Sequence, residues 1–297
     1  MKLIKPSYQI IEPTGYTIDD IYKSIELAGR VSHRSEDRIT EDSAKTFVER
    51  MMNMKHLSTC EFGTIYLAIP MTTYAPEAVN TYLDNPYSKV NECNKFIFTD
   101  KYGDKVSAWC ITTNLRVLIE NNCLEDLEFL CEPTEYHHKR YTVKFILDRG
   151  ILAEFTRHRR FSFMAESTRY CNYSKDKFNN ELTFIIPCWI DDIEEKSYTS
   201  FVEYHPTKYD SAKLWFDVCM NSEDTYIDLL DKGWKPEQAR NILPLSLKTE
   251  LYMCGFAEDW EKFFELRTAS NAHPQSRELA IPLHEEFKNK NYVLHNS

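Results

Sequence analysis

Residues 141–157 read YTVKFILDRGILAEFTR, and this stretch decides the class of fold. Apolar side chains alternate from Tyr141 to Leu147, which predicts a strand with one buried face. After Asp148 the apolar spacing changes to that of a helix that runs to Phe155. The pattern therefore predicts a strand followed directly by a helix, with Arg157 near the end of that helix.

The same patterns extend outward from this stretch in both directions. They predict strands at residues 2–12, 62–69, 95–98, 106–112 and 182–187, and helices that start near 17, 40 and 236 or cover 115–130, 209–231, 258–268 and 276–290. Strands and helices do not alternate regularly, so we expect an α+β fold with a mixed sheet packed against long helices. We expect residues 1–297 to form a single domain, with the region around 70–140 as an elaboration of it.

The composition excludes several classes of protein. Acids outnumber basic residues by 46 to 36, for a formal net charge of −10, which argues against non-specific nucleic-acid binding as the main task. No secretory signal is visible, and no stretch approaches the roughly 20 apolar residues that span a bilayer. The nine cysteines form no C-x-x-C pair, so we expect reduced thiols in a cytoplasmic protein and no metal site.

Glycine is scarce, with seven residues in 297. None are spaced as G-x-G, so the chain has neither the dinucleotide fingerprint of a Rossmann fold nor a P-loop. If this protein binds a nucleotide, arginines and helix ends must hold the phosphates.

Residues 157–169, RHRRFSFMAESTR, hold four arginines and one acid in an acidic protein. Such closely spaced like charges persist where an anion compensates them, or where they face water. The arginine side chain offers a planar set of donors that fits phosphate oxygens in pairs. With Ser167 and Arg169 following Arg157 at set distances, we favour a phosphate or nucleotide site.

Three further clusters contain residues that could carry chemistry. Residues 56–61 read HLSTCE, and a capped helix end explains them equally well. Residues 236–244 read PEQARNILP, where Glu237 and Arg240 share a helix face and could form a surface salt bridge. Arg267 follows Trp260 and two phenylalanines at the spacing of a buried face, which is costly for a cation unless it meets a ligand or is paired, for example with Glu250 or Glu278.

Taken together in chain order, the four clusters resemble the signature of the flavin-dependent thymidylate synthases. The central element, Arg-His-Arg followed after seven residues by Ser, matches Arg157, His158, Arg159 and Ser167. The resemblance covers roughly residues 20–70 and 141–290. Compared with the compact members of that family, this chain resembles one that carries an insertion at about residues 70–140.

The resemblance implies an FAD-dependent methyltransferase that converts dUMP to dTMP, with methylenetetrahydrofolate as carbon donor and NADPH as reductant. It also implies a homotetramer whose active sites combine several chains, with neither nucleic acid nor a membrane as partner. The residues implied to contact FAD are His56, Ser58, Arg157, His158, Arg159 and Glu166. Those implied to hold dUMP are Glu154, Arg157, Glu166, Ser167, Thr168, Arg169, Arg240 and Arg267.

Within that family resemblance, Arg267 is the implied catalytic residue. C5 of uracil is a poor nucleophile, and negative charge must develop across N3 and O4 before it attacks a one-carbon donor. A guanidinium beside those atoms stabilises this charge as it forms. No enzymic nucleophile is then required, and we expect Cys188, at the end of an apolar strand, to belong to the core.

The chain departs from the family pattern at several positions. Phe256, Glu258 and Lys262 stand where compact members carry asparagines and an arginine, on the adenine side of FAD. Glu154 stands where many members have Gln, and an acid there needs a compensating arginine. Asn271 stands where a histidine is usual, and His273 lies two residues on.

An alternative of another class is a nucleotide- or RNA-binding module that uses residues 157–169 without redox chemistry. The two hypotheses differ in whether the protein carries a flavin.

Overall fold

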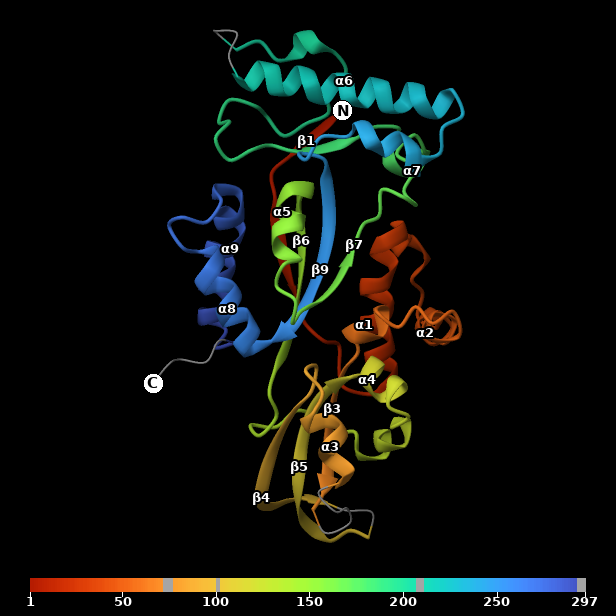
Figure 1. Ribbon diagram of the computed structural model, residues 1–297, viewed down its shortest axis with the longest axis vertical. Coiled ribbons are helices and arrows are strands. Elements are labelled where there is room, and N and C mark those ends of the chain that lie inside the picture. The colour runs from red at the N-terminus through yellow and green to blue at the C-terminus, as the bar shows by residue number, and fades with distance from the viewer. Residues whose placement is uncertain (72–76, 100–101, 207–210, 293–297) are drawn as a thin grey trace.

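The structure is a computed structural model that describes residues 1–71, 77–99, 102–206 and 211–292. It is elongated, and Figure 1 shows three regions stacked along its long axis: a helical cap, a central sheet with helices on both sides, and a second sheet. In the described residues, no helix is long and apolar enough to cross a membrane.

The central sheet has four antiparallel strands in the order β2-β6-β9-β7. Their bounds are Ser7–Ile11 for β2, Arg140–Asp148 for β6, Lys248–Phe256 for β9 and Ser162–Ala165 for β7. The predicted strand at 141–147 is confirmed as β6. The sequence patterns did not predict β7 or β9, although every residue of β9 is buried.

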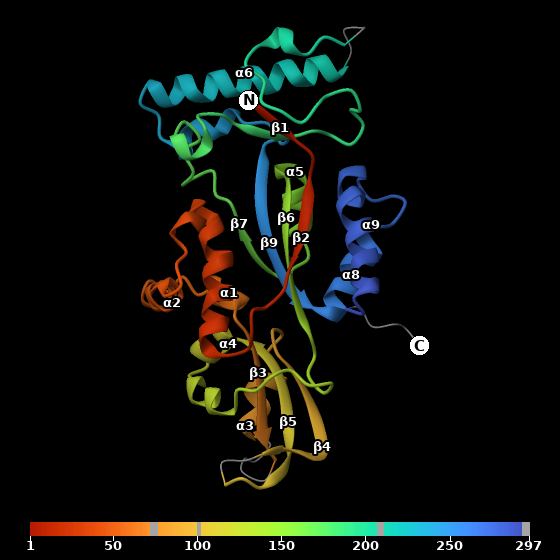
Figure 2. The ribbon, with the colours of Figure 1, turned by 180° about the vertical axis from the view of Figure 1, so that it is seen from behind.

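Each face of β9 packs against different helices. Leu251 and Met253 belong to a core with α8 (Ala257–Arg267), α9 (Pro274–Asn289) and α5 (Arg149–Phe155). Tyr252 and Cys254 face the other way and pack against α1 (Ile18–Arg30). This alternation is that of a strand buried on both faces. In Figure 2, seen from behind, α1 and α8 lie on opposite sides of the sheet.

The helix α1 begins at the predicted cap. Thr17 accepts a hydrogen bond from the backbone of Asp20, and the Asp20 side chain accepts one from the backbone of Thr17, which is a capping box. Beside α1 lies α2 (Ser43–Asn53), whose Phe47 and Val48 are buried. The long helix α6 (Ser211–Asp231) and the short α7 (Pro236–Ala239) form the cap with the parallel pair β1 (Lys2–Ile4) and β8 (Thr183–Ile185). The predicted start of α6 at 209 lies outside the described residues.

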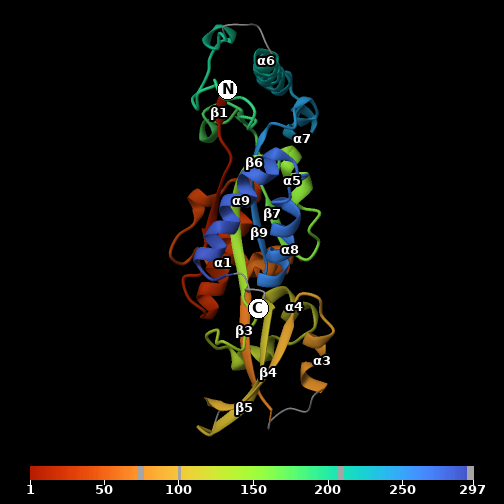
Figure 3. The same ribbon diagram turned by 90° about the vertical axis from the view of Figure 1, so that its left-hand side faces the viewer.

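The second sheet has the order β3-β5-β4 and lies at the opposite end from the cap, as Figure 3 also shows. Its strands are β3 (Thr64–Pro70), β4 (Lys89–Thr99) and β5 (Lys105–Asn114), accompanied by α3 (Glu77–Leu83) and α4 (Leu115–Glu120). The strands predicted at 62–69, 95–98 and 106–112 are thereby confirmed, and the α+β class is confirmed with them. The region at about 70–140, predicted as an elaboration, holds β4, β5, α3 and α4, while β3 begins before it at Thr64.

Arg140 joins the two ends of the segment 64–140, which contains the second sheet and which we call the excursion. The chain leaves the central part at Thr64 and returns at Arg140. One guanidinium nitrogen of Arg140 donates to the carbonyl oxygen of Glu61 at 3.1 Å, and the other donates to the hydroxyl of Thr64 at 3.1 Å. The entry and exit of the second sheet are therefore held together by one side chain.

Candidate active site

Arg267 ends α8 next to the end of α5. The apolar face of α8, with Trp260, Phe263 and Phe264, is buried against the central sheet as predicted. The Arg267 guanidinium donates from Nη1 to the Glu154 carboxylate and from Nη2 to the Glu154 carbonyl, both at 2.6 Å. Arg267 is thus the compensating arginine that Glu154 needs, and neither Glu250 nor Glu278 is its partner.

His158 completes this group. Its Nε2 accepts a hydrogen bond from Nε of Arg267 at 3.0 Å, which requires a neutral ring at that nitrogen. Burial and the positive charge of Arg267 lower the pKa of His158 to about 4. We call Glu154, His158 and Arg267 the Arg267 cluster.

The lowered pKa of His158 predicts a pH effect on stability. An unfolded histidine binds its proton near pH 6.5, whereas the folded one does so only near pH 4, so protonation favours the unfolded chain as the pH falls between these values. His158→Gln should flatten this part of the stability profile, as measured by urea unfolding at pH 7 and pH 5. His205→Gln, at an exposed position, serves as the control, and parallel profiles for wild type and His158→Gln would contradict the assignment.

A groove of about 880 Å³ lies beside the Arg267 cluster, and Glu154 is part of its lining. Asp148 caps α5 by accepting from the backbone of Ile151 and also accepts from Gln275 at 2.9 Å. The exposed Trp189 and His273 meet edge to face on the groove, with ring centroids 6.1 Å apart. His273 lines the groove, whereas Asn271 is not part of its lining. We call this the Glu154 groove.

Arg157 and Arg159 follow α5 and are exposed. Neither side chain forms an ion pair or hydrogen bond within the part of the chain that the structure describes. Strand β7 then separates them from Ser167 and Arg169. Arg157 and Arg159 therefore lie at the opposite end of a four-residue strand from Ser167 and Arg169 of the same chain.

Residues 167–170, which follow β7, form a turn that contacts α7, and we call it the Ser167 turn. The backbone amide of Ser167 donates to the carbonyl of Ser32 at 3.2 Å. Thr168 accepts a hydrogen bond from Arg240 at 3.4 Å, and Arg169 pairs with Glu237 at 3.2 Å. The structure thus brings together four residues predicted to hold dUMP: Ser167, Thr168, Arg169 and Arg240. The surface salt bridge between Glu237 and Arg240 that the sequence left open is replaced by these two contacts.

Glu166, predicted to contact both ligands, is only 2% exposed. Its carboxylate accepts hydrogen bonds from Lys248 and from the hydroxyl of Tyr173, both at 2.8 Å, and lies 3.4 Å from Arg34. Lys248 also binds Glu250 at 2.6 Å. Within the described chain, Glu166 anchors the start of the Ser167 turn, and its contact with a ligand stays a prediction.

A basic cavity of about 630 Å³ opens between α1, α2 and the Ser167 turn. The predicted residues His56 and Ser58 lie on it and are exposed. The sequence patterns did not indicate the cationic residues that join them: Arg30, Arg34, Arg38, Arg50 and Lys177. Asp37 is the one acid among the lining residues that the structure describes.

The positive charge of the basic cavity affects the pKa of His33. The His33 ring stacks on Tyr170, with centroids 4.3 Å apart. Burial and the nearby cations Lys177, Arg50 and Arg38 lower the pKa of His33. A positive field of this kind favours an anionic ligand.

The departures from the family pattern at Phe256 and Glu258 have local explanations. Glu258 binds Lys89 at 2.8 Å and His138 at 2.5 Å, and both partners belong to the excursion between Thr64 and Arg140. Phe256 is buried, and Lys89 and Arg140 lie over its ring. These two side chains hold the excursion against the end of β9. Lys262 lies on α8 and is exposed.

Two other predictions concern the position of Cys188 and metal binding. Cys188 is exposed, so its prediction as a core residue is wrong. The buried run that precedes it continues through Ile186 and Pro187, and the chain reaches the surface at Cys188. Among the described residues, no group of histidine, cysteine and acidic side chains could hold a metal ion.

Comparison with known proteins identifies relatives of this chain. The family described as thymidylate synthase complementing protein matches residues 132–291, more than half of the chain. A probable flavin-dependent thymidylate synthase of Paramecium bursaria Chlorella virus 1 is 30% identical over 150 residues, which are 49% of this chain and 65% of the relative. The flavin-dependent thymidylate synthase of Synechocystis sp. is 30% identical over 152 residues, which are 49% of this chain and 65% of the relative.

A third relative, the flavin-dependent thymidylate synthase of Haloarcula marismortui, is 27% identical over 50% of this chain and 61% of its own length. The matches thus span less than two thirds of these relatives. A solved structure, of a UMP/dUMP methylase PolB from Streptomyces cacaoi bound with 5-Br dUMP, aligns with 97% of this chain and 93% of its own at 16% identity. The TM-score of this alignment is 0.42.

Proposed function

Because this chain belongs to the thymidylate synthase complementing protein family, we propose that it is an FAD-dependent enzyme that methylates dUMP to dTMP. Methylenetetrahydrofolate would supply the carbon and NADPH the electrons. The observation that carries the proposal is the basic cavity, where the predicted residues His56 and Ser58 lie among five cationic side chains in a protein of net charge −10.

The side chains of the basic cavity fit a phosphate-bearing cofactor. Arg38, Arg50 and Lys177 would hold the pyrophosphate of FAD, since guanidinium and ammonium groups are strong donors to phosphate. Tyr170 and His33 form a stacked aromatic wall on which a flat ring can pack. Bound FAD would supply the hydride that reduces the transferred carbon to a methyl group.

The Arg267 cluster would act on the uracil ring. Arg267 would place its guanidinium beside N3 and O4 and stabilise the charge that develops there before C5 attacks the one-carbon donor. Glu154 fixes the orientation of that guanidinium, and a neutral His158 adds no second positive charge beside it. Ser167, Thr168, Arg169 and Arg240 would bind the phosphate of dUMP.

The separation of these groups supports a homotetramer with active sites shared between chains. Arg157 and Arg159 are exposed, and β7 keeps them away from the Ser167 turn of the same chain. A second copy of the chain would supply either Arg157 and Arg159 or the Ser167 turn to a shared active site. The cytoplasmic location that we propose is consistent with free thiols at all nine cysteines.

An absorbance spectrum tests the proposed function. The purified protein should be yellow or take up added FAD, and NADPH should bleach the flavin band in the presence of dUMP. Arg50→Met should weaken FAD binding, while Lys232→Met, at an exposed turn directly after α6, should leave it unchanged. Colourless protein that fails to take up FAD would reject the proposal and favour a binding module without redox chemistry.

The proposed mechanism predicts that Cys188 is dispensable. Partial desolvation of the Cys188 thiol and the charge of Glu278 raise its pKa, so the protonated and less nucleophilic form dominates at neutral pH. Cys188→Ala should therefore retain dTMP formation within about twofold of wild type, measured at saturating dUMP. An inactive but normally folded variant would instead support a thiol nucleophile.

A further inference from the structure

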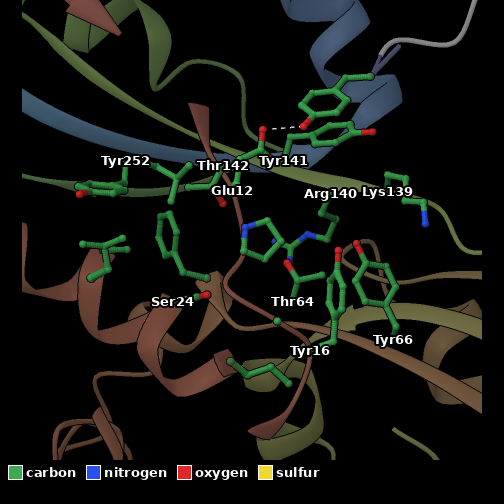
Figure 4. A pocket seen from close by; sticks show the side chains of 18 residues that line it. Glu12, Tyr16, Ser24, Thr64, Tyr66, Lys139, Arg140, Tyr141, Thr142 and Tyr252 are labelled. Atoms are coloured by element: carbon green, nitrogen blue, oxygen red, sulfur yellow. Dashed lines mark hydrogen bonds between the residues drawn. The ribbon is translucent and has the colours of Figure 1, made fainter. Parts of the chain in front are cut away.

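A second cavity lies outside the candidate active site, at the junction of the central sheet with the second sheet. It has a volume of about 250 Å³ and is lined by residues of α1, β3 and the start of β6, with Tyr292 at its rim. None of its lining residues belongs to the four sequence clusters. Its β3 side lies outside residues 132–291, which the family matches. We call it the tyrosine cavity (Figure 4).

The first notable property of the tyrosine cavity is an unbalanced positive charge. Arg140 is 9% exposed, and within the described residues its guanidinium donates to the Thr64 hydroxyl and to backbone carbonyls. Lys139 donates to the carbonyl of Thr134 at 3.1 Å. No carboxylate of the described residues lies within ion-pair distance of either cation. A buried cation without a counter-ion is costly, and an anion entering the cavity would relieve that cost.

The acid on the cavity wall does not neutralise these cations. Glu12 accepts hydrogen bonds from Lys290 at 2.8 Å and from the hydroxyl of Tyr292 at 2.6 Å. These donors lower the pKa of Glu12 despite its partial burial, and Lys290 balances its charge. The net charge facing the cavity is therefore positive.

The second property is the aromatic wall. Tyr16 and Tyr66 meet edge to face, with ring centroids 5.6 Å apart, and Tyr141 stacks on Tyr292 at 4.2 Å. Figure 4 shows Tyr16 and Tyr66 next to Arg140, with Tyr252 at the far end. Rings arranged in this way bind a flat aromatic ligand by stacking and edge contacts. The volume is just below the usual range for drug-sized ligands, so one or two fused rings would fill it.

We propose that the tyrosine cavity binds a small planar aromatic compound that carries a carboxylate or phosphate group. The rings would lie between the tyrosines, and the anionic group would face Arg140 and Lys139. The tyrosine cavity differs from the basic cavity and the Glu154 groove in location and in lining residues, and FAD is too large for it.

Binding of three matched probes tests this proposal by calorimetry on the full chain saturated with FAD and dUMP. The probes are 2-naphthoate, 2-naphthyl phosphate and the neutral 2-naphthamide. Wild-type protein should bind at least one anion about tenfold more tightly than the amide, because hydrogen bonds to a charged group are stronger than neutral ones. The tighter of the two anions identifies the natural group. Equal affinity for all three probes, or no binding of either anion, would overturn the proposal.

Variants then locate the bound probe. Ser24 lines the cavity from α1, so Ser24→Phe should fill it and abolish binding, while Ser24→Ala should bind as wild type. Lys139→Met keeps the apolar stem and should weaken the anion about threefold to fivefold without affecting the amide. Arg50→Met, in the basic cavity, should have no effect. Unchanged binding by Ser24→Phe, or loss in Arg50→Met, would place the probe elsewhere and reject the site.

Discussion

Arg267→Ala should lower dTMP formation by about a hundredfold to a thousandfold, the usual effect of removing one preorganised donor to a developing negative charge. The protein should stay folded, because the side-chain contacts of Arg267 go to Glu154 and His158 and not to the apolar face of α8. The loss should fall mainly on kcat, since the charge on the uracil ring develops only as the reaction proceeds.

Two variants control for the loss of the Arg267 contacts themselves. Glu154→Gln keeps a hydrogen-bond acceptor for Arg267 and removes the negative charge, so it should retain most activity. Arg267→Lys keeps the charge but cannot bind two acceptors in one plane, so it should remain strongly impaired. Near-normal turnover of Arg267→Ala, with dUMP saturating, would remove Arg267 from the catalytic role.

Lys248→Met should reduce the free energy of unfolding by about 3–5 kcal/mol, as expected when one partner of a buried ionic group is removed. Lys248 lies between Glu166 and Glu250, at 2.8 and 2.6 Å, and both carboxylates are less than 5% exposed. Arg34, the other cation near both acids, has a side chain that is 29% exposed. Urea unfolding at pH 7 measures the change.

Lys144→Met is the matched control for Lys248→Met. Lys144 also pairs with Glu250, at 2.7 Å, but its side chain is 23% exposed against 10% for Lys248. Its removal should cost less than about 1 kcal/mol, because water can replace a partly exposed cation. Similar losses in the two variants would show that Lys248 is not the central cation of this group.

The difference between β6 and β9 shows which parts of the fold the sequence could predict. In β6 the apolar residues alternate, and the period of two identifies a strand. The first residues of β9 include Lys248 and Glu250, whose charges hide a strand that is buried throughout. Those charges are compatible with burial because Glu166, Arg34 and Lys144, distant in sequence, lie beside them. Local patterns cannot contain that information.

The predicted strand at residues 2–12 shows a different limit. In the structure it is two strands, β1 and β2, which belong to different sheets. The break falls at Lys5 and Pro6, where proline removes a backbone donor and ends regular pairing. The apolar pattern continues through the break, and the choice of sheet depends on partners that the pattern does not specify.

The candidate site was predictable where its residues are close in sequence or form a motif. Ser167, Thr168 and Arg169 are consecutive, and Arg240 stood out in its own short helix. In contrast, Arg38, Arg50 and Lys177 come from separate segments, and each resembles an ordinary surface cation. Only the packing of α1 and α2 beside the Ser167 turn makes them neighbours.

The position of Arg140 also bears on how this chain could change its length. Because Glu61, Thr64 and Arg140 meet at one point, the 64–139 segment is attached like an inserted domain whose two ends lie together. Residues could be added to it or deleted from it without shifting the register between β6 and β9. A short linker from Gly63 to Tyr141 would join the two ends if the whole segment were removed. The same geometry would let an ancestral chain acquire or lose the second sheet in a single step, while the catalytic residues keep their places.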